Sequence, residues 1–493
     1  MPLQLAVATL AFLAPLPTLS SQSSPPSFAQ ETTTVRSFDG RTMPGTWVTI
    51  SVPERRATPN RTITVAALRL ASTSGHPGNP IVFLMGGPGI PGSVIAPIPP
   101  YFSLFERLRE LSDVIIVDQR GIGRSLPVLD CPLMDPLPGD AIGSPSRLVA
   151  AVRQEVTACA QRWRAAGAEP MAYNTIESAD DVDAIRSALG AERVDLLAFS
   201  YGTRLALAYL HRHPAHVGRM VLQGVNGPGL VVKRPEMISR KLTRIGVLLA
   251  ADSAWQGSTD LVTAAGNARA RLTNSPATLT ISNRRTGGQS TVSLGRDGLD
   301  ALVALSLDDR RLPALLVSVA AGDVRLLTRF AEDAWNGFAA GTVGLMPRAV
   351  NCAADRPATR WATVRRESKR SLIGMPIDNA FLTDDFCRAV GYRSPPREFG
   401  KLLVSAVPAL LLTGTLDATN PAENAAEVAR YLSNAVRLDV ENAAHEALTI
   451  PSVQDVVVDF FSGKDVRGRR VRADSPHFLT LDESLKAPVR RAP

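Results

Sequence analysis

Three side chains that could carry out nucleophilic catalysis each follow an apolar run of the sequence. Ser200 comes directly after V-D-L-L-A-F, Asp417 lies in the turn after P-A-L-L-L, and His445 lies shortly after V-R-L-D-V. A serine hydroxyl becomes a nucleophile when a base takes its proton, and the base needs an acid that fixes its tautomer. Together they predict a catalytic triad in which Ser200 is the nucleophile, His445 the base and Asp417 the acid.

The turn that carries Ser200 has small residues on both sides, in the pattern Ala198-x-Ser200-x-Gly202. A sharp turn between a strand and a helix holds a serine hydroxyl out in strained, exposed geometry. Small residues are needed there because the two backbones approach closely. The alternative is a common Ser-x-Gly turn without chemistry, and the other two residues of the triad argue against it.

A tetrahedral intermediate needs backbone N–H donors for its oxyanion. We predict the N–H of Tyr201, at the start of the helix after the nucleophile, and the N–H of Gly87, in the G-G-P-G sequence of residues 86–89. An ordinary tight turn is the alternative for residues 86–89. Their glycines are too few and wrongly spaced for a phosphate-binding loop.

The remaining histidines and the D-Q-R-G sequence are assigned no catalytic role. His211, His213 and His216 lie at the end of the helix that Ser200 opens, so we expect solvated or helix-end positions. Arg120 is expected to anchor neighbouring loops.

Apolar runs alternate with helical patterns along the chain, which predicts a mostly parallel sheet flanked by helices. Reactive groups collect at the carboxyl ends of the strands of such sheets. Besides the run before Ser200, the predicted core strands are 81–85, 114–117, 220–225, 408–412 and 436–440. The predicted helices are 146–165, 178–189, 422–432 and 452–461, and short strands at 35–38, 47–52 and 62–71 form an antiparallel edge.

Between the two halves of this pattern, the sequence changes to helices rich in Arg, Leu and Ala, with a hairpin at 278–282 and 291–294. This block predicts an inserted cap. The predicted divisions are a signal peptide (1–29), the core (30–225 and 402–463), a mainly helical cap (226–401) and a basic C-terminal tail (464–493). The tail has eight basic and four acidic residues and is expected to be a solvated extension.

The first 29 residues contain no charged side chain and are rich in Ala, Leu and Pro. Ser27 and Ala29 fit a signal-peptidase site, so the mature chain is predicted to begin near Gln30. The expected N-terminal Lys or Arg is missing. Pro15 and Pro17 argue against a membrane-spanning helix. A secreted or periplasmic protein without stable membrane insertion is predicted.

The composition excludes several classes of function. The chain has 493 residues and a formal net charge of +8, but its basic residues are scattered and only 5% of residues are aromatic, so nucleic-acid binding is not predicted. Four cysteines permit three connectivities, and their order favours Cys131 with Cys159 and Cys352 with Cys387. No Cys-x-x-Cys spacing supports zinc, and neither a metal nor another cofactor is predicted.

Several motifs together resemble the proline iminopeptidase-like branch of the α/β-hydrolase superfamily, especially its secreted tripeptidyl-aminopeptidase type. They are G-G-P-G at 86–89, D-Q-R-G-I-G-R-S at 118–125, S-Y-G-T-R at 200–204, G-T-L-D at 414–417 and N-A-A-H at 442–445. The chain length, cysteine pairs and late insertion are similar to those relatives. The resemblance implies an α/β-hydrolase fold and a serine exopeptidase that removes residues from a free N-terminus without a metal.

The sequence departs from this pattern at three positions. Ala198 replaces a glycine, Met85 stands where many relatives have histidine, and Ala354 stands in C-A-A-D where relatives often read C-A-E-D. An aminopeptidase must bind an ammonium group, for which buried cap carboxylates are the natural partners. With Ala354 in place of an acid, Asp355 or Glu236 is the candidate to bind it, and a surface or structural acid is the alternative for each.

The predicted substrate is therefore a small peptide or ester. We predict an aminopeptidase that releases N-terminal residues, and a carboxylesterase is the alternative because the triad serves either bond. A non-catalytic binding protein would not need all three members of the triad. A serine in place of a carboxylate nucleophile argues against a dehalogenase. The sequence does not predict the oligomeric state.

Overall fold

The structure is a computed structural model that describes residues 28–133, 137–258, 260–284, 286–338, 342–392 and 400–488. The predicted signal peptide lies outside the described residues, apart from Phe28 and Ala29, which begin strand β1. Export therefore stays a prediction. Within the described ranges, no helix is both long and apolar enough to cross a membrane.

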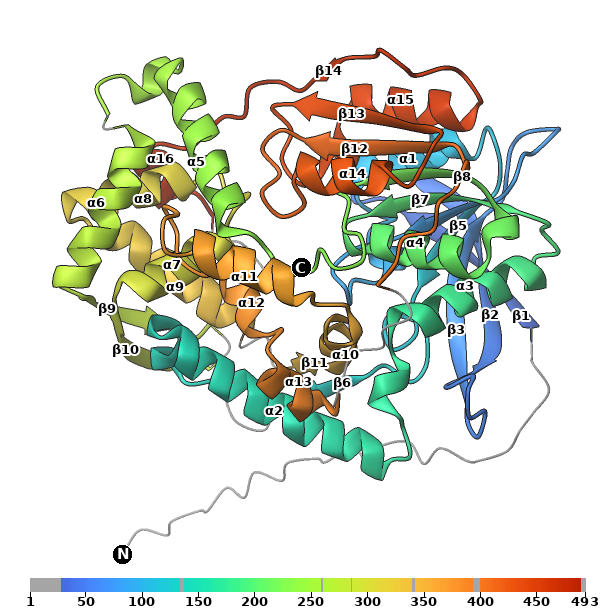
Figure 1. The fold of residues 1–493 in the computed structure, drawn as a ribbon, viewed down its shortest axis with the longest axis horizontal. Helices are drawn as coiled ribbons and strands as arrows, with labels where there is room; N and C mark the ends of the chain where they lie inside the picture. The colour runs from blue at the N-terminus through green and yellow to red at the C-terminus, as the bar shows by residue number, and fades with distance from the viewer. Residues whose placement is uncertain are drawn as a thin grey trace, which may run out of the picture.

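A ten-stranded sheet in the order β1-β2-β3-β5-β4-β7-β8-β12-β13-β14 forms the core (Figure 1). Strands β1 to β3 pair antiparallel at one edge, and the strands from β5 through β4 to β14 run parallel. The strands are β1 (Phe28–Arg36), β2 (Thr42–Pro53), β3 (Thr62–Leu70), β4 (Ile81–Leu84), β5 (Val114–Asp118), β7 (Val194–Phe199), β8 (Val217–Gln223), β12 (Ala409–Gly414), β13 (Ala435–Glu441) and β14 (Val471–Arg472).

The apolar runs of the sequence correspond to strands that are buried on both faces of the sheet. Every residue of β4, β5, β7 and β12 is buried, so these strands show no alternation of polar and apolar side chains. Strand β2, in the antiparallel part of the sheet, alternates between buried and more exposed positions, as a strand with one covered face does. The prediction of a mostly parallel sheet with an antiparallel edge is confirmed.

Helices cover both faces of the sheet. Helices α1 and α15 pack on one face, and α3, α4 and α14 pack on the other, which also faces the cap. The helices that cover the sheet are α1 (Pro99–Leu108), α3 (Thr175–Ala188), α4 (Tyr201–Arg212), α14 (Ala422–Ala429) and α15 (Pro451–Phe461).

The cap follows β8 and is mainly helical, with the predicted hairpin formed by β9 and β10. It stands beside the carboxyl ends of the parallel strands (Figure 1). Its elements are α5 (Pro235–Ala250), α6 (Leu261–Asn274), β9 (Ala277–Ser282), β10 (Gln289–Leu294), α7 (Arg296–Leu305), α8 (Leu312–Ala321), α9 (Arg325–Phe338), β11 (Thr342–Gly344), α10 (Leu345–Ala353), α11 (Ala358–Glu367), α12 (Ile377–Ala380) and α13 (Asp384–Val390).

An earlier segment of the chain, which the sequence placed in the core, also belongs to the cap. Strand β6 (Asp130–Pro132) pairs with β11, and the long helix α2 (Pro145–Ala165) packs against α13 (Figure 1). The indole N–H of Trp335 in α9 donates to the carbonyl of Leu137 at 2.8 Å. The segment precedes the nucleophile, so sequence order alone did not reveal its place.

Two disulfides reinforce this region, with the pairing that the order of the cysteines favours. Cys131–Cys159 joins β6 to α2, and Cys352–Cys387 joins α10 to α13. Closing loops of this length typically stabilises a protein by about 3 kcal/mol each.

The C-terminal tail is not a solvated extension, and that prediction is wrong. Strand β14 extends the core sheet beside β13, and the chain then crosses to the cap, where α16 (Leu481–Lys486) packs against α8 and α9. The indole N–H of Trp255 donates to the carbonyl of Phe478 at 3.1 Å. The few apolar residues among many charged ones hid these contacts from the sequence pattern.

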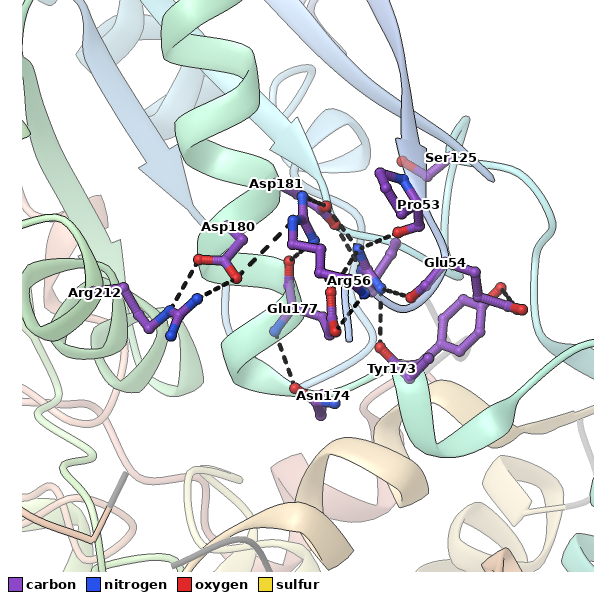
Figure 2. A network of polar contacts seen from close by, with 12 residues as sticks. Pro53, Glu54, Arg56, Ser125, Tyr173, Asn174, Glu177, Asp180, Asp181 and Arg212 are labelled. Carbon is purple, nitrogen blue, oxygen red and sulfur yellow. Dashed lines mark hydrogen bonds and ion pairs between the residues drawn. The ribbon is translucent and has the colours of Figure 1, made fainter. Parts of the chain in front are cut away.

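A buried network of arginines and carboxylates joins the β2–β3 connection, the loop after β5 and helix α3 (Figure 2). Arg120 is fully buried, and its guanidinium donates to both carboxylate oxygens of Asp181 at 2.7 Å. It also donates to the carbonyls of Glu54 and Ala172. Arg56 donates to Asp181 from the other side at 2.8 Å. Arg120 thus anchors neighbouring loops, as the sequence predicted.

Replacing Arg120 with methionine leaves the buried Asp181 without its bidentate partner. We expect the Arg120→Met variant to lose about 3–5 kcal/mol in the free energy of unfolding, measured by urea denaturation. The control is Arg124→Met in the same motif, whose exposed ion pair with Glu31 should cost about 1 kcal/mol or less. Equal losses in both variants would contradict a structural role specific to Arg120.

Candidate active site

Ser200 stands in a strained turn between β7 and α4. Its backbone has φ 54° and ψ −121°, a region that residues other than glycine rarely adopt. A Cβ on Gly202 would lie 1.9 Å from the carbonyl oxygen of Leu84, so only glycine fits there. Ala198 is completely buried in β7 with its methyl group accommodated. This explains why the turn keeps its second glycine and tolerates alanine in place of the first.

His445 and Asp417 complete a chain of hydrogen bonds that ends on Ser200. The Nε2 atom of His445 lies 2.9 Å from Ser200 Oγ, and its Nδ1 atom lies 2.8 Å from Asp417 Oδ2. The carboxylate accepts the Nδ1 proton, which leaves Nε2 free to accept the serine proton. The other carboxylate oxygen of Asp417 accepts the backbone N–H groups of Thr419 and Asn420. The structure therefore brings together the three residues that the sequence selected.

The surroundings of His445 shift its protonation. Burial alone would lower its pKa, but the charge of Asp417 and the hydrogen bond to it outweigh burial, and the pKa of His445 is raised above its ordinary value. The charge of Asp308 raises this pKa further, and the charge of Lys233 lowers it. Asp417 therefore stabilises the imidazolium that forms when His445 takes a proton from Ser200.

The G-G-P-G segment, called here the oxyanion loop (residues 86–89), lies directly against the nucleophile. A Cβ on Gly86 would lie 2.7 Å from Ser200 Cβ, so the loop needs glycine at this position. Gly87 has φ 108°, in the left-handed region that favours glycine. Tyr201 is the first residue of α4, where the N–H has no acceptor within the helix. The predicted oxyanion donors, Gly87 and Tyr201, therefore directly follow the two residues that meet at this contact, Gly86 and Ser200.

Asn420 is a polar contact of the nucleophile that the sequence did not identify. Its side chain is buried, and its amide Nδ2 donates to Ser200 Oγ at 3.4 Å. Its backbone N–H donates to Asp417 at 2.8 Å. In the sequence, Asn420 stands three residues after Asp417 in A-T-N-P. An asparagine at such a position is equally well explained as an ordinary turn residue, so the sequence did not point to a contact with Ser200.

The two carboxylates predicted to bind substrate lie in different surroundings. Glu236 is half-buried on the first turn of α5 and pairs with Arg240 at 3.4 Å. Asp355 is half-buried beside the loop that follows β8, where a Cβ on Gly229 would lie 3.8 Å from its Oδ2 atom. Asp355 forms no ion pair with any other described residue. Of the two, it is the one placed near the carboxyl edge of the sheet.

Ala354, which replaces the acid of many relatives, is packed in an apolar environment. It is buried in a small cluster with Val231, Val232, Val364 and Leu382. A charged side chain at this position would lose hydration among these methyl groups.

The histidines after α4 are ion-pair partners rather than free surface groups. His213 Nε2 lies 2.8 Å from Asp180, and His216 Nδ1 lies 2.6 Å from Asp183. Asp183, His213 and His216 have the geometry of metal ligands, but Arg186 already pairs with Asp183 at 2.7 Å. This group lies at the far end of α4 from Ser200.

Comparison with known proteins agrees with this geometry. The family described as "alpha/beta hydrolase fold" matches residues 79–449. The chain is 30% identical over 188 residues to "Serine protease Hip1" of Mycobacterium tuberculosis (36% of this chain, 35% of that protein). It is 29% identical over 191 residues to "Tripeptidyl aminopeptidase" of Streptomyces coelicolor (36% and 35%). It is 28% identical over 153 residues to "Proline iminopeptidase" of Neisseria meningitidis (31% and 34%). The matches thus span about a third of these relatives.

The raised pKa of His445 predicts the pH dependence of Ser200 reactivity. Only neutral His445 can take the serine proton, so the rate of labelling by a fluorophosphonate should rise with pH, with a midpoint above about 6.5, the ordinary histidine value. Asp417→Asn removes the charge that raises the pKa. We expect its midpoint to move to lower pH and its rate to fall by about 10³–10⁴. An unchanged midpoint in Asp417→Asn would contradict the assigned partner.

Proposed function

The chain belongs to the α/β-hydrolase-fold family, and from this membership and the contacts of Ser200 we propose an exported serine hydrolase that releases N-terminal residues from short peptides. The observation that carries the proposal is the chain of hydrogen bonds from Asp417 through His445 to Ser200. The uncharged N-terminal segment and the two disulfides support export to an oxidising compartment.

The geometry accounts for an acyl-enzyme mechanism. Ser200 Oγ attacks the substrate carbonyl while His445 Nε2 takes the hydroxyl proton, and the N–H groups of Gly87 and Tyr201 bind the oxyanion that forms. When the tetrahedral intermediate breaks down, His445 gives the proton to the leaving group. Water activated by His445 then attacks the ester of Ser200 and releases the acyl product. Asp417 keeps the imidazole oriented throughout.

Two features support a peptide with a free N-terminus as the substrate. The relatives include proteins named tripeptidyl aminopeptidase and proline iminopeptidase. Asp355 provides a half-buried carboxylate beside the loop after β8 that no described cation pairs with, as binding of a substrate ammonium requires.

A carboxylesterase is the second candidate, and the surroundings of Ala354 favour it. The apolar cluster around Ala354 can pack against an acyl or alkyl group of a substrate. A carboxylate at this position would instead bind an ammonium group. The same triad cleaves esters and amides, so the catalytic residues do not distinguish the two candidates.

A panel of three substrate classes tests the proposal: aminoacyl and tripeptidyl anilides, the same anilides with acetylated N-termini, and short acyl esters. We expect kcat/KM for free anilides to exceed that for blocked anilides by about 10-fold or more, because a charge-assisted contact is lost on acetylation. Blocked anilides cleaved as fast as free ones would rule out the aminopeptidase and leave the esterase.

The matched control for the mechanism is Ser200→Ala. We expect turnover of every substrate in the panel to fall by at least about 10⁴-fold, since the acyl-enzyme cannot form. Retention of full activity by Ser200→Ala would refute the nucleophile. Asp355→Asn should reduce only the advantage of free over blocked anilides.

A further inference from the structure

Helix α10 belongs to the part of the cap that lies next to the core (Figure 1). A Cβ on Gly89 would lie 3.0 Å from Pro347 Cγ, so the start of this helix touches the loop beside the nucleophile. One turn later, Asn351 accepts a hydrogen bond from Arg204 of α4 at 3.2 Å. The disulfide between Cys352 and Cys387 fixes the other end of α10. Residues of α10 therefore have a rigid position next to the active site.

Arg348 on this helix has a guanidinium with no hydrogen-bond or ion-pair partner among the described residues. Burial lowers the pKa of Arg348, yet its side chain is only half-buried and keeps access to solvent. The guanidinium lies 4.9 Å above the ring of Phe381. Within the described part of the chain it donates no hydrogen bond and forms no ion pair. An interior cation that solvent can reach and no carboxylate satisfies is suited to bind an anion.

Two lysines near the site are already paired with carboxylates. Lys233 forms an ion pair with Asp378 at 3.4 Å, and its charge acts on His445. Lys241 is ion-paired with Asp308, whose charge also acts on His445. The charge of Asp378 reaches Arg348 as well, but that carboxylate contacts Lys233. Each of these carboxylates thus has a lysine, whereas Arg348 has no carboxylate partner among the described residues. Arg204 of α4 also has none, but its guanidinium is buried over the ring of Tyr201.

The backbone around Lys233 is held rigidly. Asn379 is completely buried, its Oδ1 atom accepts the N–H of Lys233 at 2.8 Å, and its Nδ2 atom donates to the Lys233 carbonyl at 2.8 Å. These bonds hold the segment with Lys233 next to the segment with Asp378, the residue before Asn379.

We propose that Arg348 binds a carboxylate of the substrate, so that the enzyme prefers acids over their neutral counterparts. This inference rests on the proposed serine hydrolase function. A planar guanidinium can donate two parallel hydrogen bonds to a carboxylate, which fixes the orientation of the bound molecule as well as its affinity. If Asp355 binds the N-terminal ammonium of a short peptide, the carboxylate that Arg348 binds belongs to a side chain of that peptide or to its free C-terminus.

Two substrate pairs separate the sources of the carboxylate. The first pair compares a 4-methylumbelliferyl hemisuccinate ester with the butyrate ester, so that the charge lies on the acyl side. The second compares a tripeptide acid with the tripeptide amide, so that the charge lies on the leaving side. For at least one pair, we expect kcat/KM of the acid to exceed that of the neutral partner by about 10- to 100-fold.

Arg348→Met should reduce this acid-to-neutral ratio to about 1, and Arg348→Lys should keep only part of it because an ammonium lacks the bidentate geometry. Arg366→Met, which removes an exposed arginine of α11, should leave the ratio unchanged. Thermal unfolding of all three variants checks that they fold. The Lys variant also tests the proposal if the Met variant unfolds.

The outcomes distinguish this inference from the proposed function. The wild-type protein could hydrolyse neutral substrates in a Ser200-dependent way and still show an acid-to-neutral ratio of kcat/KM near 1 for both pairs. This result would overturn the role of Arg348 but not the proposed function. A ratio that Arg348→Met leaves intact would do the same. Absence of turnover and of fluorophosphonate labelling would overturn both.

Discussion

The left-handed backbone of Ser200 is the constraint on which the rest of the site depends. A residue with a side chain occupies φ 54° only when its neighbours hold it there, at a cost of about 1–3 kcal/mol. Gly202 against the Leu84 carbonyl and Gly86 against Ser200 leave no room for another conformation. The strain places Oγ beyond the end of the sheet, where His445 can reach it. The same close packing places the oxyanion loop beside the hydroxyl.

The acid and the base depend on a second close contact, between the turns that follow β12 and β13. A Cβ on Gly414 would lie 2.2 Å from the carbonyl oxygen of Ala444 and 2.4 Å from that of Ala443, so the two turns meet at glycine. Asp417 and His445 extend from these turns to within hydrogen-bonding distance of each other. Asn420 ties the arrangement back to Ser200. The site is therefore assembled from three strand ends that backbone contacts hold together.

Sequence reasoning succeeded where short-range pattern and chain order carry the information. Fully buried strands appear as apolar runs, and residues after such runs in a parallel sheet share one edge, so Ser200, Asp417 and His445 could be selected together. It failed where distant segments meet. Nothing near residues 130–165 indicates that they pack with the cap, and nothing near Arg348 indicates that the lysines of α5 and of the preceding loop are already paired. Such contacts depend on the three-dimensional course of the chain.

The course of the C-terminal segment has a consequence for the order in which the protein is completed during synthesis. The residues that connect the core strand β13 to helices α8 and α9 of the cap follow all three residues of the triad in the sequence, so the ribosome adds them later. Until they emerge, Trp255 lacks its hydrogen-bond acceptor and the cap lacks the cover of α16. The cap is therefore completed only after the triad residues have been synthesised. A truncated chain would carry the whole triad and an unfinished cap.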